Sequence, residues 1–228
     1  MEKKIYIAED DANIRSLEKA FLEKNGFLVY TFENGDLLYS KFQEEPADLI
    51  ILDIMMPGTD GLTLCATLRR ESSVPIIIVS AKGSEIERVA GITIGCDDYL
   101  VKPFSPIELV ARVQAIFRRM EMMRPNTETE KSIICGDLKI DSARFQVTKD
   151  GKPLDLTPNE FNLLCYLAKN SNRAVSREEL LQKLWDFGHT EVDTRAPDDT
   201  MKRLRKKLTE YKSSVKIETV RGFGFRIG

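Results

Sequence analysis

The chain has 228 residues, long enough for one large domain or two small ones, and 42% hydrophobic and 31% charged residues are typical of globular proteins. No apolar run approaches the ~20 residues that span a bilayer, and the N-terminal apolar stretch is too short for a secretory signal. We therefore expect a cytoplasmic protein without membrane contact. The four cysteines form no CxxC pair, and a single histidine argues against a zinc site.

The net charge of −2 is divided unevenly along the chain. Residues 1–131 hold 16 Lys and Arg against 22 Asp and Glu, a net charge of −6. Residues 132–228 hold 18 against 14, a net charge of +4. An acidic half joined to a basic half indicates different partners for the two halves.

Short apolar runs recur through the first half with the spacing of alternating strands and helices. They are residues 5–8, 28–32, 49–52, 76–79 and 99–101. Amphipathic stretches lie between them, including one from Ala12 to Asn25 that Gly26 ends, and a last one that Ser105-Pro106 opens. The pattern predicts an α/β domain over residues 1–120, with a doubly wound, five-stranded parallel sheet.

A polar stretch without periodicity, residues 121–131, reads as a linker, and a different pattern follows it over residues 132–228. Strands are predicted at 133–135, 138–140 and 144–148, and helices at about 158–169, 177–185 and 197–210. The chain ends in an alternating segment, residues 216–226, typical of a hairpin. This order predicts an α+β domain of the winged helix-turn-helix type.

Polar residues stand where the predicted parallel strands end. Glu9 and Asp10 follow the first strand, and Asp53, Ser80 and Lys102 follow the third, fourth and fifth. The carboxyl ends of such strands share one crevice, so these groups should meet. Carboxylates this close repel one another unless a cation such as Mg²⁺ lies among them. The set suits phosphoryl transfer to Asp53, which depends on positioning and charge neutralisation.

The first half resembles the receiver domain of response regulators. The resemblance lies in Glu9-Asp10-Asp11, residues 52–61, Ser80-Ala81, Asp97-Asp98-Tyr99 and Lys102-Pro103-Phe104. It implies that Asp53 is the phosphoacceptor, that Asp10, Asp53 and the backbone carbonyl of Met55 bind Mg²⁺ directly, and that Glu9 contacts the ion through water. It also implies that Ser80 and Lys102 contact the phosphoryl group, that the Lys102-Pro103 bond is cis, and that Tyr99 is an aromatic switch.

Within the family, the OmpR/PhoB branch pairs one face of the receiver with a second copy. The resemblance implies intermolecular pairs of Arg88 with Glu108 and of Asp98 with Arg112, beside Asp97. An apolar patch with Ile92 and Val110 would supply most of the affinity, since exposed ion pairs contribute only ~0–1 kcal/mol. The alternative is that Glu108 and Arg112 form an ordinary i,i+4 pair within one helix.

The second half resembles the winged-helix domain of the same branch, through motifs that include 156–164 and 219–225. Five of the six residues from Lys202 to Lys207 are basic. A helix followed by a hairpin reads the major groove and grips nearby phosphates. The DNA-binding residues we expect are Thr200, Lys202, Arg203, Arg205, Lys206, Lys207, Thr219 and Arg221. The start of the helix, residues 194–201, departs from the family pattern, and loop 186–194 stands where family members contact RNA polymerase.

The favoured hypothesis is a DNA-binding transcription regulator, not an enzyme, that a sensor histidine kinase phosphorylates and that then dimerises on promoter DNA. A Mg²⁺-dependent phosphatase using Asp53 as its nucleophile is the second hypothesis. Such enzymes commonly carry a general acid two residues on, where this chain has Met55, and the basic helix would be unexplained. A regulator that binds DNA without phosphorylation is the third.

Overall fold

The computed structural model describes residues 2–81, 94–122, 132–142, 144–184 and 196–228. Two compact units divide the chain, residues 1–116 and 117–228. The division falls inside one helix, α5 (Pro106–Met122). The first part of this helix, up to Ile116, belongs to the first unit.

The first unit contains the five predicted strands in a single parallel sheet. The strands are β1 (Lys4–Ala8), β2 (Leu28–Phe32), β3 (Leu49–Asp53), β4 (Ile76–Ser80) and β5 (Asp98–Val101). The described helices are α1 (Ala12–Lys24), α2 (Gly35–Glu44), α3 (Gly61–Glu71) and α5. The strand order is β2-β1-β3-β4-β5, and every pairing is parallel, which confirms the doubly wound sheet.

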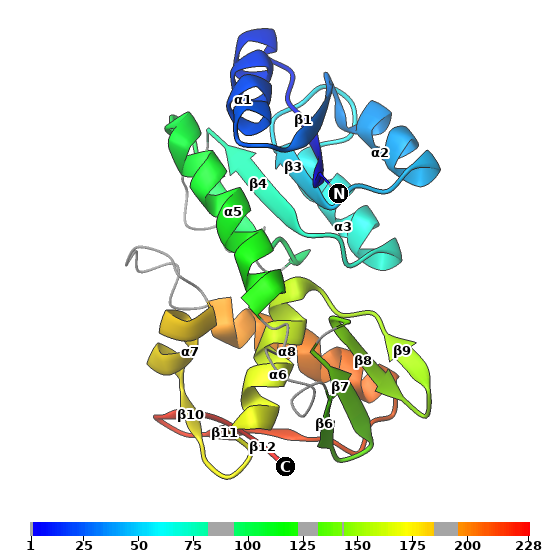
Figure 1. Ribbon diagram of the computed structural model, residues 1–228, viewed down its shortest axis with the longest axis vertical. Coiled ribbons are helices and arrows are strands. Elements are labelled where there is room, and N and C mark those ends of the chain that lie inside the picture. Colours follow the sequence, from blue (N-terminus) through cyan, green and yellow to red (C-terminus); the bar gives the residue numbers. More distant parts are fainter. Residues whose placement is uncertain (1, 82–93, 123–131, 143, 185–195) are drawn as a thin grey trace. The chain divides into compact units, whose positions relative to one another are not determined.

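Helices cover both faces of this sheet, α1 and α5 on one face and α2 and α3 on the other (Figure 1). Alternate residues of each strand therefore enter different apolar layers. Tyr6 and Ala8 of β1 join the layer under α2 and α3, whereas Ile5 and Ile7 point to the opposite face, and all four are fully buried. The near-continuous apolar runs in the sequence follow from this burial on both faces.

Local sequence signals define the ends of α1. The Asp11 side chain accepts hydrogen bonds from the backbone N–H groups of Asn13 and Ile14, which are donors that a helix leaves without partners at its start. Gly26 follows the helix with a φ of +85°, a conformation that glycine adopts without strain. The helix thus begins and ends where the sequence predicts.

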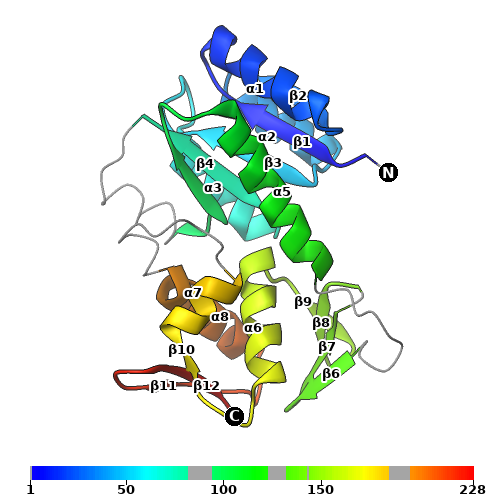
Figure 2. The same ribbon diagram turned by 60° about the vertical axis from the view of Figure 1, so that its left-hand side comes forward.

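The second unit combines two antiparallel sheets with three described helices. The strands are β6 (Ser132–Cys135), β7 (Leu138–Asp141), β8 (Gln146–Lys149), β9 (Lys152–Leu154), β10 (Val175–Ser176), β11 (Ile217–Val220) and β12 (Gly224–Ile227). The helices are α6 (Pro158–Lys169), α7 (Arg177–Leu184) and α8 (Ala196–Glu210). The first sheet has the order β6-β7-β8-β9 and the second β10-β12-β11 (Figure 2).

The sequence prediction did not include β9, which contains Pro153. Asp150 and Gly151 both have positive φ, so they form a tight turn that pairs Lys149 with Lys152. Proline is tolerated here because β9 is an edge strand that pairs only with β8. Among the described helices, none is long and apolar enough to cross a membrane.

Candidate functional site

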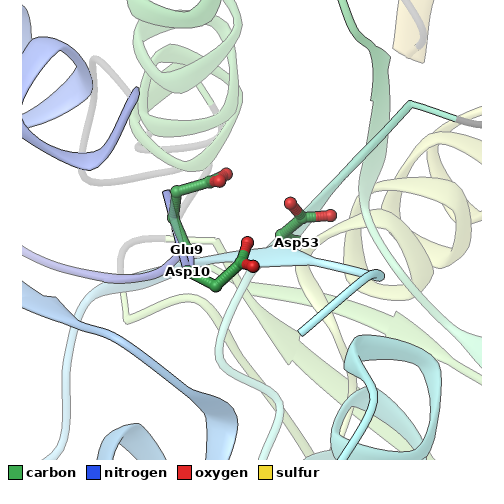
Figure 3. A group of neighbouring side chains, drawn as sticks. All are labelled: Glu9, Asp10 and Asp53. Atoms are coloured by element: carbon green, nitrogen blue, oxygen red, sulfur yellow. The ribbon is translucent and has the colours of Figure 1, made fainter. Parts of the chain in front are cut away.

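Asp53 stands at the carboxyl end of β3, the central strand, and its residue is only 4% exposed. Glu9 and Asp10 follow β1, the neighbouring strand, and the three side chains converge on one point (Figure 3). One carboxylate oxygen from each residue lies within 4.8 Å of the others. The predicted meeting of carboxylates at strand ends is therefore present in the structure.

Lys102 supplies positive charge to this acidic group. Its ammonium lies 2.5 Å from Asp53 Oδ2 and 2.5 Å from Glu9 Oε2. Burial raises the pKa of Glu9, and the negative charge of Asp53 adds to this against the opposing effect of Lys102. Burial lowers the pKa of Lys102, but hydrogen bonds to Asp53 and Glu9 outweigh burial, and its pKa is raised. The ammonium is therefore held charged beside Asp53.

The loop that carries Glu9 and Asp10 is held by two contacts that the sequence did not suggest. The Arg15 guanidinium donates to the backbone oxygens of Glu9, at 2.6 Å, and Asp10, at 3.0 Å. The Asp11 N–H also donates to Glu9 Oε1 at 3.3 Å. Arg15 thus fixes the backbone on which two of the three carboxylates stand.

The remaining predicted residues of this site lie around Asp53. Ser80 is fully buried at the end of β4, and its carbonyl accepts a hydrogen bond from the Lys102 N–H. The Met55 N–H donates to Asp53 Oδ1 at 3.0 Å, and the Lys102-Pro103 peptide bond is cis. Tyr99 is 7% exposed and packs in the layer under α2 and α3, so the ring of the predicted switch points inward here.

In the second unit, α8 follows α6 and α7 and precedes the hairpin of β11 and β12, as a winged helix-turn-helix requires. Its buried face carries Met201, Leu204 and Leu208, which enter the core of the unit. Lys202 and Lys206 lie on the exposed face, and the Lys206 side chain is 79% exposed. Arg221 is exposed in the turn of the hairpin. These three cations are therefore available to a polyanion.

Comparisons with known proteins agree with both halves of this description. Residues 5–114 match the family described as the response regulator receiver domain, and residues 151–227 match the family described as transcriptional regulatory protein, C terminal. The chain is 42% identical to the transcriptional regulatory protein ResD of Bacillus subtilis, over 99% of this chain and 95% of that protein. The chain belongs to the response regulators of the OmpR/PhoB type.

Other relatives support the same family. The transcriptional regulatory protein BaeR of Escherichia coli is 42% identical over 98% of this chain and 92% of its own length. The solved structure of DrrB from Thermotoga maritima, an OmpR/PhoB homolog, is 30% identical with a TM-score of 0.53, and the match covers 99% of both chains. This response regulator is thus a DNA-binding transcription regulator, as predicted.

The face of the regulator expected to dimerise shows contacts within the chain. Asp97 is 4% exposed, and its Oδ2 accepts hydrogen bonds from the Arg69 guanidinium at 2.6 Å and the Ile76 N–H at 2.9 Å. Asp97 therefore anchors the start of β5 to α3 and β4, and its place on a dimer face stays a prediction. Arg88 and Ile92 lie outside the described residues.

Arg112 pairs inside the chain as well. Its guanidinium lies 3.1 Å from Asp98 Oδ1 and 2.7 Å from Glu108 Oε1. The i,i+4 pair of Glu108 with Arg112 is thus present, and an intermolecular pair of Asp98 with Arg112 would require an exchange of partners. Val110 is only 6% exposed, whereas Ile107 in the first turn of α5 is 70% exposed. The apolar patch expected around Ile92 and Val110 stays a prediction.

Three residues expected to contact DNA make contacts within the regulator. Thr200 is 1% exposed because it lies on the buried face of α8, and its hydroxyl accepts a hydrogen bond from Arg203 at 3.2 Å. Arg203 and Lys207 also lie 3.5 Å and 2.8 Å from the carboxylate of Glu160, which is buried on α6. These pairs fix α8 against α6. Thr200 is buried, which speaks against a direct DNA contact, and the expected DNA contacts of Arg203 and Lys207 stay predictions.

Arg205 and Thr219 form a hydrogen bond with each other. The Arg205 guanidinium donates to the Thr219 hydroxyl at 2.9 Å and to the backbone oxygen of Ile217 at 2.9 Å. Both were expected to contact DNA directly, and their side chains join α8 to β11. Loop 186–194, where the family resemblance places a contact with RNA polymerase, lies outside the described residues.

Two buried acids matter to the regulator and were not singled out in the sequence. Glu160 caps α6, since its carboxylate accepts from the Thr157 N–H at 2.9 Å while pairing with α8. Glu18 on α1 is 1% exposed, and neither carboxylate oxygen has a hydrogen-bond partner among the described residues. The sequence did carry a signal, because Glu18 lies four residues from both Ile14 and Leu22, on the apolar face.

Proposed function

We propose that a sensor histidine kinase phosphorylates Asp53 in a Mg²⁺-dependent reaction, and that this promotes receiver dimerisation and promoter binding. The supporting observation is the placement of Asp53 beside Lys102 and two further carboxylates at the ends of adjacent strands. We propose a regulator that acts stoichiometrically rather than an enzyme. A regulator of bacterial promoters acts in the cytoplasm.

In the proposed transfer, a carboxylate oxygen of Asp53 forms a bond to the phosphorus of a phosphohistidine. The P–N bond of the donor breaks, and the imidazole nitrogen keeps the electron pair and later takes a proton from solvent. Lys102, 2.5 Å from Asp53 Oδ2, is placed to neutralise charge on the phosphoryl oxygens. Burial of Asp53 strengthens this interaction because little water competes for the ammonium.

The residues present fit a magnesium ion. Glu9, Asp10 and Asp53 offer oxygen ligands within 4.8 Å of one another, and hard cations prefer such oxygens. We propose that these three residues and the backbone carbonyl of Met55 hold Mg²⁺, which would neutralise negative charge on the transferred group. Because Lys102 contacts both Glu9 and Asp53, it balances part of the acidic charge itself.

Labelling tests the site directly. The full chain with Mg²⁺ and a radioactive small phosphodonor should take up label, and Asp53→Asn should abolish uptake. Asp150→Asn is the matched control, since that side chain is 82% exposed in the hairpin turn of the other unit, and it should label like the wild type. Equal labelling of Asp53→Asn and the wild type would refute the assignment.

A regulator that binds DNA without phosphorylation is the alternative. It has one supporting observation, because the ion pairs of Arg112 are satisfied within a single chain. Sedimentation and DNA affinity, each measured with and without the phosphodonor, distinguish the two. Phosphorylation should shift the chain towards dimers and tighten binding in the wild type but not in Asp53→Asn. Unchanged sedimentation and affinity would favour the alternative.

A further inference from the structure

One side chain of α8, that of Arg205, forms hydrogen bonds to the hairpin of β11 and β12. Arg205, on α8, donates from Nε to the backbone oxygen of Ile217 and from its terminal nitrogen to the hydroxyl of Thr219. Both acceptors belong to β11, two residues apart, so the planar guanidinium is held at two points. Two-point bonding fixes the orientation of a guanidinium as well as its distance.

A second set of contacts, made by Arg177 of α7, links α8 and β12. Arg177, at the start of α7, lies 2.9 Å from Asp198 of α8, and its guanidinium lies 4.7 Å from the ring centre of Phe225 in β12. Arg205 lies 5.6 Å from the centre of the same ring. The buried ring of Phe225 therefore sits near two cations, one from each helix, and Asp198 offsets part of their charge.

The turn of the hairpin is tied down as well. The Phe223 N–H donates to the Val220 oxygen at 3.0 Å, and the Arg177 N–H donates to the Phe223 oxygen at 3.3 Å. Arg221 in this turn is exposed, and so are Lys202 and Lys206 on α8. The distance between the cation of the turn and the cations of the helix thus depends on how firmly β11 is held to α8 (hairpin in red and α8 in orange in Figures 1 and 2).

We infer that Arg205 is a positioning residue, which holds the hairpin against α8 so that Arg221 and the exposed lysines of α8 contact DNA together. This inference rests on the proposed DNA binding of the chain, and it assigns Arg205 no DNA contact of its own. A hairpin released from α8 must be ordered again on binding, and that cost reduces affinity. Substitution of Arg205 should therefore weaken DNA binding only when Arg221 is present.

A double-mutant cycle tests this dependence. The probe is a duplex enriched from a random-sequence library by the full wild-type chain, and the dissociation constant is measured by fluorescence anisotropy. Arg205→Met should weaken binding by a factor similar to that of Arg221→Ala, and the double variant should bind within about twofold of Arg221→Ala. Lys206→Ala is the control. When it is combined with Arg221→Ala, the dissociation constant should rise by the product of the two single increases.

Two further variants keep the test decisive. Arg205→Lys retains the charge but not the two-point geometry, so it should not restore affinity. Thr219→Val removes one acceptor with little change of shape and should show the same dependence on Arg221, even if Arg205→Met fails to unfold cooperatively.

If the loss of affinity in the double variant equals the product of the losses in Arg205→Met and Arg221→Ala, the two residues act independently. That result would show that Arg205 contacts DNA itself and would overturn the inference. Full recovery by Arg205→Lys, or unchanged affinity of Arg205→Met, would do the same. A wild-type chain that enriches no duplex would instead refute the DNA binding on which the inference rests.

Discussion

Glu18 gives a sharp test of the energetics of the receiver unit. Burial, reinforced by the negative charges of Glu9 and Asp53 against the opposing charge of Lys102, raises the pKa of Glu18 from 4.5 to about 8. The folded receiver therefore holds this carboxyl protonated at neutral pH, whereas the unfolded chain ionises it near pH 4.5. Glutamine has nearly the same shape and cannot ionise, so Glu18→Gln isolates the effect of this one proton.

The sign and size follow from linkage. A group whose pKa is raised on folding contributes stability that is fully present below its unfolded pKa, here 4.5, and is lost as pH rises through its folded pKa, about 8. At about 1.36 kcal/mol per pH unit, the loss is about 3 kcal/mol at pH 7 and approaches about 5 kcal/mol above pH 8. Glu18→Gln should escape this loss.

The assay is urea unfolding of the full chain at several pH values between 4 and 9, followed by far-UV circular dichroism. The free energy of unfolding of Glu18→Gln relative to the wild type should rise with pH across this range. Glu23→Gln, whose side chain is 47% exposed on the same helix, is the control and should show no such trend. A difference between Glu18→Gln and the wild type that does not vary with pH would refute the reasoning.

Two further substitutions test the contacts that hold the structure together, one beside Asp53 and one between α6 and α8. A Cβ at Gly61 would lie 2.1 Å from the backbone oxygen of Asp53, so Gly61→Ala should destabilise the receiver by about 3 kcal/mol or more in urea unfolding; a loss under about 1 kcal/mol would contradict this. Glu160→Gln leaves Arg203 and Lys207 without their buried anion and should cost the second unit about 3 kcal/mol. Urea unfolding followed by far-UV circular dichroism measures this loss, and labelling of Asp53 should be unaffected.

The sequence predicted the meeting of the carboxylates and Lys102 around Asp53 well, because topology alone brings these residues together. Once five strands are parallel, Glu9, Asp53, Ser80 and Lys102 must share one edge of the sheet, whatever the details of packing. The contacts that support this edge were not predictable in the same way. Arg15 could have reached many acceptors, and only the path of the loop after β1 shows that it binds the carbonyls of Glu9 and Asp10.

The DNA-binding residues were harder to predict, because a run of charges does not reveal which side chains a neighbouring helix uses. Thr200 stands four residues before Leu204 and eight before Leu208, so helical spacing already places it on the buried face. Arg203 and Lys207 could not be separated from Lys202 and Lys206 without knowing that Glu160 faces them from α6. The contact of Asp97 with Arg69 was hidden for a similar reason, since Arg69 lies on another element.

Several basic side chains of α8 pair within the protein, and this affects how strongly DNA binding depends on salt. Each phosphate neutralised by a protein cation releases condensed counterions, and the logarithm of affinity falls by about 0.9 per contact for each tenfold rise in salt. The sequence suggests six such cations per chain, namely Lys202, Arg203, Arg205, Lys206, Lys207 and Arg221. Arg203, Arg205 and Lys207 are committed to partners inside the fold. Binding should therefore depend on salt about half as steeply as the basic run implies, which leaves recognition less sensitive to changes in ion concentration.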